Sequence, residues 1–530
     1  MPAYLTLSSR RTRHCQVNID QKTYERRWWI LGVLAISVFL VVVDNLIINV
    51  ALPTLQRELD ATTTSLQWIV DSYALVFAGL LLAGGGLGDR FGRKGALQIG
   101  LVLFAVFSVM GGFADTSSEL ILWRGAMGIG AALVFPATLA IITNLFIDPI
   151  ERAKAIGIWS AVSGMAVAFG PVAGGFLLEH FWWGSVFLIN VPIVIIALTA
   201  GAFLLPKSRD QNPHAIDYVG FLLSVVAIGS LVFTVIESPV WGWGSSTSYL
   251  GFAISAAALA GFVLYESRVE HPLLDVRVFR NARVSAAAGS ISIAFFCLFG
   301  FTFLVTQYFQ YVRGYDTLSA GIHTIPFAVG AGVTAPFAAR AALKWGTKRV
   351  VALGLLNMSI GLFIASSMDA NSSYFGHVII SMVLMANGLS LVTSPSTDAI
   401  MGSLNRDKAG VGSAINDTGR EVGGTLGVAV VGSVFVSLYS PKILEKFEQI
   451  PGLIANLPKG VLSMSEESVG AAYQVAQQAP VGIRSQVEDA VSASFLHGFS
   501  MACIVASIAA LVGALFALKY LPSQSVSPEN

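Results

Sequence analysis

Charged residues are scarce in this chain of 530 residues, and this scarcity argues against a soluble fold. Only 12% of the residues are charged, whereas 55% are hydrophobic and the mean hydropathy is +0.70. Soluble domains carry about 25% charged residues. The composition therefore predicts an integral membrane protein rather than a soluble protein with a large core.

Cysteine is also rare, since Cys15, Cys297 and Cys503 are the full set and lie far apart. Their spacing excludes a disulfide framework and predicts no metal site. The net charge of +1 creates no field that would attract nucleic acid. The sequence also lacks H-E-x-x-H, G-x-S-x-G and G-x-x-x-x-G-K-[ST]. We therefore expect neither an enzyme nor an ATP-driven pump.

Long apolar runs are abundant. A membrane-spanning helix needs about 20 mostly apolar residues. Fourteen runs meet this requirement: 28–50, 66–87, 95–114, 119–141, 153–178, 184–205, 216–236, 248–266, 284–306, 317–340, 349–368, 375–397, 410–438 and 494–519. The fold expected is all-α, with fourteen transmembrane helices arranged as two six-helix bundles plus two inserted helices.

The distribution of basic residues predicts the orientation. With the N-terminus in the cytoplasm, 24 Lys and Arg lie on the cytoplasmic side and 6 on the opposite side. This asymmetry follows the positive-inside rule. We therefore expect a multi-pass protein of the cytoplasmic (inner) membrane with both termini in the cytoplasm.

The spacing of the runs divides the chain into five parts. These are a cytoplasmic leader (1–27), a first bundle (28–205), two linkers around two inserted helices (206–283), a second bundle (284–519) and a cytoplasmic tail (520–530). The second bundle contains an extracytoplasmic loop, 439–493. Its alanine- and glutamine-rich part, 465–493, predicts two short amphipathic helices over the outer surface, with a flexible loop as the alternative.

A glycine-rich, charged turn, GGLGDRFGRK at 85–94, separates the second and third runs. A membrane chain needs such a turn to re-enter the bilayer, and its positive charge keeps this end in the cytoplasm. The order of residues resembles the signature between helices 2 and 3 of the major facilitator superfamily.

Four further motifs resemble signatures of the fourteen-helix drug/proton antiporters within this superfamily. They are VDNLIINVALP at 43–53, the glycine-proline motif at 164–175, FLINVP at 187–192 and HPLLDVRVFR at 271–280. The resemblance covers nearly all of 28–519. It implies a proton-coupled antiporter that exports lipophilic, often cationic compounds, with the proton gradient as its energy source and no cofactor.

The expected partners are lipophilic small molecules, protons and membrane lipid, and the expected state is a monomer. Two other functions stay open. The first is a dedicated exporter of a single metabolite or antibiotic, which the sequence barely separates from a multidrug pump. The second is a membrane receptor or scaffold, which would not need carboxylates buried in both bundles.

Charged residues inside the apolar runs are the candidates for energy coupling. A charge near the bilayer centre costs about 2.5–3.5 kcal/mol on insertion scales, so each needs a partner, a cavity or a neutral form. Asp44 in helix 1 and Arg124 in helix 4 both fall in the outer half of the membrane and can meet; Asp71 lies near the outer end of helix 2. The arginine would keep the Asp44 carboxylate ionised, and separation of the helices would favour proton uptake. The resemblance also implies proton transfer at this pair.

Helix 13 carries Asp417, Arg420 and Glu421, which we expect to face the cavity opposite Asp44. Asp417 and Glu421 are four residues apart and share one helix face, so one of the two acids is expected to stay protonated. They are candidates for both proton coupling and substrate binding. His323, read mainly as a polar wall residue, and Tyr308 complete the predicted cavity. Acids and aromatic rings together suit lipophilic cations.

Two motifs predict moving parts. In helix 5, small residues allow close helix packing and the proline bends the helix. The predicted antiporter hinge comprises Gly164, Gly170, Pro171, Gly174 and Gly175; tight packing alone is the alternative. The resemblance implies that this motif favours export, and that the cytoplasmic turn latches the bundles in the outward-open state. The predicted latch comprises Asp89, Arg90, Arg93 and Lys94; a role in topology alone is the alternative.

Overall fold

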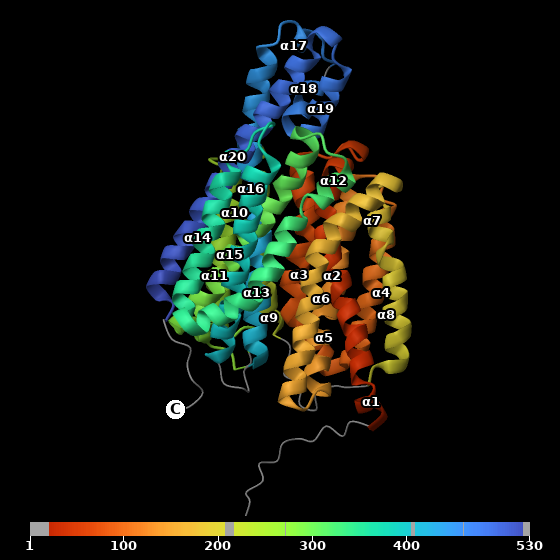
Figure 1. Ribbon diagram of the computed structural model, residues 1–530, viewed down its shortest axis with the longest axis vertical. Coiled ribbons are helices and arrows are strands. Elements are labelled where there is room, and N and C mark those ends of the chain that lie inside the picture. Colours follow the sequence, from red (N-terminus) through yellow and green to blue (C-terminus); the bar gives the residue numbers. More distant parts are fainter. Residues whose placement is uncertain (1–20, 207–216, 271, 404–408, 459, 523–530) are drawn as a thin grey trace, which may run out of the picture.

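The computed structural model describes residues 21–206, 217–270, 272–403, 409–458 and 460–522. Within these ranges the chain is helical and has no strand. Most helices run along the long axis of the molecule, and a smaller helical cap stands at one end (Figure 1). The short helix α1 (Gln21–Glu25) and the end of the last helix lie at the opposite end.

The first group of long helices, called the first bundle below, comes from the N-terminal part of the chain. It consists of α2 (Arg27–Glu58), α3 (Thr63–Phe91), α4 (Arg93–Gly112), α5 (Ser117–Leu145), α6 (Pro149–His180), α7 (Ser185–Leu188) and α8 (Asn190–Leu204). Side chains at the helix starts satisfy free backbone N–H groups, as N-caps do. Thr62 caps α3, Thr116 caps α5, and Asp148 caps α6 just before Pro149.

Two helices follow this group and pack mainly on each other. They are α9 (Tyr218–Trp241) and α10 (Ser246–Glu266). α9 also packs against α3 and α16. A short 3₁₀ segment, η1 (Val276–Arg280), then leads into the second group.

The second group, called the second bundle below, contains the remaining long helices. It consists of α11 (Ala282–Gln307), the π-helical turn η2 (Tyr308–Val312), α12 (Thr317–Ile322), α13 (Ile325–Trp345), α14 (Thr347–Ala365), the π-helical turn η3 (Tyr374–Val378), α15 (Ile379–Gly402), α16 (Ala409–Glu448) and α20 (Val481–Tyr520). Its main contacts are α11 with α16, α14 with α15 and α20, and α13 with α15.

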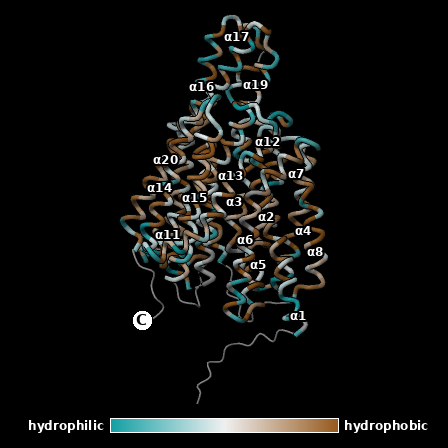
Figure 2. Tube along the Cα trace, viewed as in Figure 1, coloured by the Kyte–Doolittle hydropathy of each residue, from teal (hydrophilic) through white to brown (hydrophobic). Residues whose placement is uncertain are grey.

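The helix lengths match the expected membrane passes. Thirteen segments in the described part of the chain are long and apolar enough to cross a membrane. The apolar stretch Met165–His180 of α6 adds a shorter one, so the fourteen predicted runs each have a helical counterpart. Apolar residues prevail along the long helices in Figure 2. The prediction of an all-α membrane fold is confirmed.

The segment between helices 13 and 14 is largely helical, so the flexible-loop alternative is wrong for its described residues. α16 continues to Glu448 and α20 already begins at Val481, beyond the ends predicted for both helices. Between them lie α17 (Leu453–Asn456), α18 (Val461–Glu467) and α19 (Val469–Gln478). We call α17, α18, α19 and the adjoining ends of α16 and α20 the cap. α19 packs on α20 and also reaches α2.

The two groups of helices contact each other near the cap. α6 packs on α12, and the Thr317 hydroxyl donates a hydrogen bond of 3.2 Å to the Gly175 carbonyl oxygen. α3 packs on α16, where Gln67 Nε2 donates to the Ala429 carbonyl oxygen at 3.1 Å. These contacts join the bundles at the cap end of the molecule.

Candidate functional site

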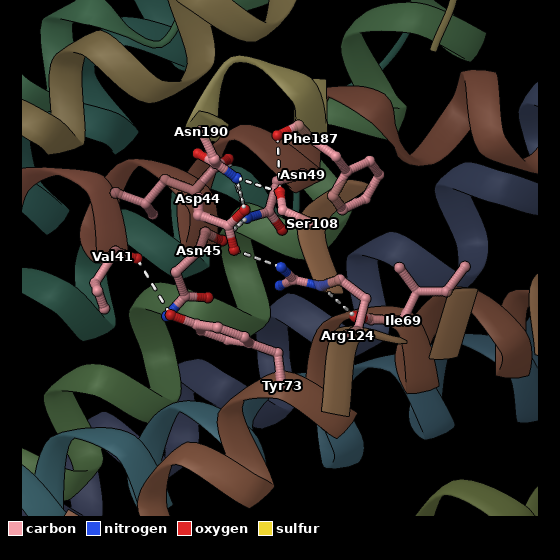
Figure 3. A network of polar contacts seen from close by, with 11 residues as sticks. Val41, Asp44, Asn45, Asn49, Ile69, Tyr73, Ser108, Arg124, Phe187 and Asn190 are labelled. Atoms are coloured by element: carbon pink, nitrogen blue, oxygen red, sulfur yellow. Dashed lines mark hydrogen bonds and ion pairs between the residues drawn. The ribbon is translucent and has the colours of Figure 1, made fainter. Parts of the chain in front are cut away.

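A buried ion pair lies inside the first bundle. Arg124 Nη1 from α5 is 2.5 Å from Asp44 Oδ2 of α2, and both side chains are 0% exposed (Figure 3). The structure thus brings together the two residues that the sequence paired. A buried ion pair is held well only when its remaining polar atoms also find partners.

The other oxygen of Asp44 is held by a residue that the sequence analysis did not single out. Asn190 Nδ2, at the start of α8, donates to Asp44 Oδ1 at 2.8 Å and to Ser108 Oγ at 2.9 Å. Ser108 Oγ in turn donates to the Phe187 carbonyl oxygen at 2.7 Å. Asn190 belongs to the FLINVP motif, so the motif was visible but its role in holding Asp44 was not.

Arg124 has two further contacts with α3. Its Nε donates to the Ile69 carbonyl oxygen at 3.1 Å, and its guanidinium lies 4.3 Å from the centre of the Tyr73 ring. Gly128, one turn along α5, permits this approach because a methyl group there would stand 2.7 Å from the Tyr73 carbonyl oxygen. The arginine is therefore fixed by an acid, a carbonyl group and an aromatic face.

A cavity lies between the bundles beside this pair, with about 940 Å³ of free space, open solvent included. Its wall is largely aromatic, with Phe77 and Phe135 from the first bundle and Phe295, Phe299, Phe301 and Phe327 from the second. Asn45, the neighbour of Asp44, also lines it. Such a wall favours contacts with apolar and aromatic surfaces.

The charged part of the cavity wall comes from α16. Arg420 and Glu421 both line the cavity, and the Arg420 guanidinium lies 4.7 Å from the centre of the Phe295 ring. Asp417, one turn earlier, is half-buried and accepts a hydrogen bond of 3.1 Å from Asn416 Nδ2. The cavity therefore has charged groups of both signs at one point of a largely apolar surface.

Two residues predicted for the cavity wall lie elsewhere in this conformation. Tyr308 is fully buried, donates to the Asp369 carbonyl oxygen at 2.8 Å and stacks on Phe499. His323 ends α12, where its Nδ1 is 2.6 Å from the Ser319 carbonyl oxygen. The His323 ring packs among the rings of Phe309, Tyr315 and Tyr374. Substrate contact by either residue stays a prediction.

Asp71 is buried in α3, one helical turn from Gln67. Neither of its carboxylate oxygens has a hydrogen-bond partner among the described residues. Burial of a carboxylate without a hydrogen-bond partner is energetically costly. Its predicted role in proton coupling stays a prediction.

The glycines of α6 serve two different interfaces. A methyl group at Gly170 would stand 3.0 Å from Leu46 Cβ, and one at Gly174 would stand 2.7 Å from Ile47 Cγ1, both on α2. Gly175 instead faces the other bundle, where a methyl group would collide with the Thr317 carbonyl oxygen of α12. Gly164 belongs to α6, but its surroundings lie outside the described part of the structure.

Close to this point, a methyl group at Gly321 would collide with the Pro171 carbonyl oxygen. The glycine-proline motif therefore packs against its own bundle and against the opposite bundle at the same time. Close packing is the observed property, and a hinge function stays a prediction.

The 85–94 turn makes the hydrogen bonds that the structure describes within the first bundle. Lys94 Nζ donates to the carbonyl oxygens of Ala202 (2.7 Å) and Leu205 (3.0 Å), at the end of α8 where a cation is favourable. Arg93 Nη1 donates to the Ala140 carbonyl oxygen at 3.4 Å, and the exposed Arg90 lies over Phe91. The Asp89 side chain lies outside the described part. The predicted latch between bundles stays a prediction.

The sequence matches a known family of membrane proteins. Residues 34–428 match the Major Facilitator Superfamily. The chain belongs to this superfamily. Members of the major facilitator superfamily are transporters, so the chain is a multi-pass membrane transporter and not an enzyme.

Curated relatives match over most of the chain. The Multidrug efflux pump LfrA of Mycolicibacterium smegmatis is 33% identical over 500 residues, which cover 93% of this chain and 97% of that protein. The Tetracenomycin C resistance and export protein of Streptomyces glaucescens is 33% identical, with 93% and 91% covered. The Methyl viologen resistance protein SmvA of Salmonella typhimurium is 32% identical, with 90% and 94% covered.

Solved structures of transporters share the fold at low sequence identity. A bacterial homolog of the human lysosomal transporter Spinster, in an inward-facing and unoccupied conformation, superposes with a TM-score of 0.63 at 16% identity, covering 95% of this chain and all of that one. The inward-open xylose transporter XylE from E. coli gives 0.56 at 14% identity, with 94% and 98% covered.

Proposed function

We propose that this member of the superfamily exports lipophilic, often cationic drugs across the cytoplasmic membrane in exchange for protons. The observation that carries the proposal is the aromatic cavity, whose wall includes Arg420 and Glu421 and which lies beside the enclosed Asp44–Arg124 pair. An aromatic surface with an acid attracts lipophilic cations. The relatives named for multidrug efflux and for methyl viologen resistance support the same substrate class.

For energy coupling, we propose that Asp44 takes up and releases the transported proton. In the conformation described, Arg124 and Asn190 each donate a hydrogen bond to its carboxylate. A rearrangement that withdraws Arg124 would leave the carboxylate better protonated. Asp71, Asp417 and Glu421 are the other acids that we propose exchange protons during the cycle.

We further propose that the cap faces the outside and that both termini lie in the cytoplasm. The excess of basic residues on the side of the termini supports this orientation. The bundles contact each other near the cap, as expected for a transporter that is closed to the outside and open to the cytoplasm. The 85–94 turn would then latch the opposite end only in the outward-open state, with the α6 glycines as the pivot.

The test is drug-dependent proton movement in liposomes that contain the purified protein. Addition of ethidium, a lipophilic cation, should drive proton movement in the wild type and in Asp115→Asn, which changes an exposed acid in the α4–α5 turn. Asp44→Asn should abolish it while the protein still inserts. Transport of ethidium without any proton movement would refute the coupling but leave drug export intact.

A second function is favoured by one specific relative. The Tetracenomycin C resistance and export protein is as similar to this chain as LfrA is, and its name gives a single antibiotic. A dedicated exporter would protect cells against one compound class only. A susceptibility panel of structurally unrelated drugs, with and without the gene, separates the two: protection against several classes supports multidrug export.

A further inference from the structure

Three of the hydrogen bonds that cross between the bundles beside the cap end on backbone carbonyl groups of α2. The donors lie on α11 and η2. The bonds are Thr306 Oγ1 to Asn49 O (2.7 Å), Gln310 Nε2 to Val50 O (2.9 Å) and Tyr311 Oη to Pro53 O (3.2 Å). We call these three donors and three acceptors the carbonyl clasp.

Pro53 explains why one acceptor is available. It lies inside α2 and has no N–H, so the Asn49 carbonyl four residues earlier loses its helical donor. Buried backbone carbonyl groups are almost always hydrogen-bonded. Asn49 is buried, and the fully buried Thr306 of the opposite bundle supplies the missing donor. The carbonyl group that Pro53 leaves without a donor in α2 is therefore hydrogen-bonded by a side chain of the opposite bundle.

The cap is tied to the same point through Gln56. Its Oε1 accepts from the Gly470 N–H of α19 at 3.1 Å, and it shares the single hydroxyl hydrogen of Tyr311 with the Pro53 carbonyl, since Tyr311 Oη is 2.7 Å from Gln56 Oε1 and 3.2 Å from the carbonyl oxygen. Gly470 has no room for a side chain, because a methyl group would stand 2.9 Å from the Tyr311 hydroxyl oxygen. Tyr473 of α19 packs its ring 5.9 Å from that of Tyr311. One side-chain oxygen thus joins both bundles and the cap.

We propose that the carbonyl clasp is the closing element of the outer gate, that Pro53 creates its central acceptor, and that α19 reinforces it through Gln56. The proposal rests on the alternating opening of the two bundles that the proposed export requires. Separation of the bundles at this end breaks all three bonds and opens the cavity toward the cap. Water then replaces Thr306 at the Asn49 carbonyl, so the cost of opening is small enough for a reversible cycle.

The test measures how often the gate is open, without measuring transport. Val42 lines the cavity and serves as a single reporter, Val42→Cys, in a protein whose three native cysteines are replaced. A membrane-impermeant maleimide labels it from the side of the cap. That side is identified independently by Val481→Cys, since Val481 is 87% exposed at the start of α20.

Thr306→Val removes the donor and keeps the shape of the side chain. We expect the reporter to be labelled about 3- to 10-fold faster, the effect of losing one hydrogen bond that stabilises the closed gate. Thr306→Ser should restore the slow rate. The matched control is Thr302→Val, because the Thr302 hydroxyl lies one turn earlier and donates within its own helix to the Leu298 carbonyl oxygen. This control should label at the parental rate.

The role of Pro53 is tested by combining two substitutions. Pro53→Ala returns an N–H to α2, which then competes with Thr306 for the Asn49 carbonyl. In that background Thr306→Val should change the labelling rate less than about 2-fold, because the carbonyl already has a donor. An equal effect of Thr306→Val in both backgrounds would refute the role of Pro53.

Tyr311→Phe provides a second test that leaves the ring packing in place, and it should also accelerate labelling. If neither Thr306→Val nor Tyr311→Phe changes the rate, while both proteins melt at the parental temperature, the clasp proposal is overturned. The readout does not depend on drug export. If the variants label at the parental rate while ethidium transport is normal, only the clasp proposal fails. If the variants label faster but the parent does not transport ethidium, only the proposed export fails.

Discussion

The two bundles hold their charged groups in different ways. In the first bundle, Asp44 and Arg124 are enclosed, and Asn190 and the Ile69 carbonyl satisfy further polar atoms of the pair. In the second bundle, Arg420 and Glu421 border the cavity, and Arg420 rests on an aromatic ring.

This difference fits the two tasks proposed above. An enclosed pair responds to changes in helix position, because a shift of α5 against α2 separates Arg124 from Asp44. Charges on a cavity wall respond to what enters the cavity. The first arrangement suits energy coupling and the second suits substrate binding. Substitutions in the first bundle should therefore affect stability more strongly than matching substitutions in the second.

The largest expected effect is that of Arg124→Ala. It leaves the Asp44 carboxylate buried without its cationic partner, which destabilises a protein by about 3–5 kcal/mol. The melting temperature of the detergent-purified protein measures this loss. The matched control is Arg57→Ala on α2, because Arg57 is exposed and its described hydrogen bond is a long one to Thr54. Equal melting temperatures for the two variants would contradict the enclosed pair.

Asn190→Ala should have the next largest effect. It removes a donor to a buried carboxylate, and a hydrogen bond to a charged group contributes about 1.5–3 kcal/mol. Thermal unfolding again provides the measurement. Asn45→Ala is the control, since Asn45 follows Asp44 in sequence but its Oδ1 accepts no described hydrogen bond. If Asn45→Ala lowered the melting temperature more than Asn190→Ala did, the contact of Asn190 with Asp44 would not be the one that stabilises the protein.

The pair of substitutions Asp417→Asn and Glu421→Gln should lower stability by less than about 1 kcal/mol, because both side chains keep their shape and hydrogen-bonding oxygen. Its effect should appear in substrate choice. Export of a cationic dye should fall more than export of a neutral drug of similar size, because the charge attraction is lost. Equal losses for both drugs would assign these acids to proton coupling instead.

The smallest effect is expected for Phe295→Leu, which removes the ring beneath Arg420. A cation–π contact contributes about 0.5–1 kcal/mol at partly exposed sites. The concentration of dye that gives half-maximal efflux should change by a few-fold at most, with the maximal rate preserved. Phe299→Leu changes another cavity residue and tests whether the Arg420 contact itself matters. If both variants changed the half-maximal dye concentration equally, the effect would come from the loss of apolar surface and not from the contact with Arg420.

Local patterns in the sequence predicted the membrane fold well, and specific contacts less well. The apolar runs have helical counterparts because the length of a helix across a bilayer is fixed by hydrocarbon thickness. The sequence predicted the pairing of Asp44 with Arg124 because these opposite charges lie at a similar depth in their membrane-spanning helices. Asn190, however, reaches Asp44 through the packing of α8 on α2 and α4, which the spacing of residues along one helix does not record.

The cap shows the same limit. The amphipathic pattern of 465–493 predicted helices, but not that α16 and α20 would extend to support them. Tyr308 and His323 were expected at the cavity. Each is instead engaged by a distant segment, the carbonyl of Asp369 for one and the ring of Tyr374 for the other. Such contacts depend on tertiary packing, which residue spacing along one helix does not encode.

The position of α9 gives the molecule two unequal sides within the plane of the membrane. α9 covers the seam where α3 meets α16, and Trp68 Nε1 of α3 donates to Glu237 of α9 at 2.9 Å. The opposite seam, where α6 meets α13, exposes large apolar side chains such as Phe169 and Val333. The boundary with the surrounding lipid is therefore built differently at the two seams, with an additional helix over one and the bundle helices themselves at the other.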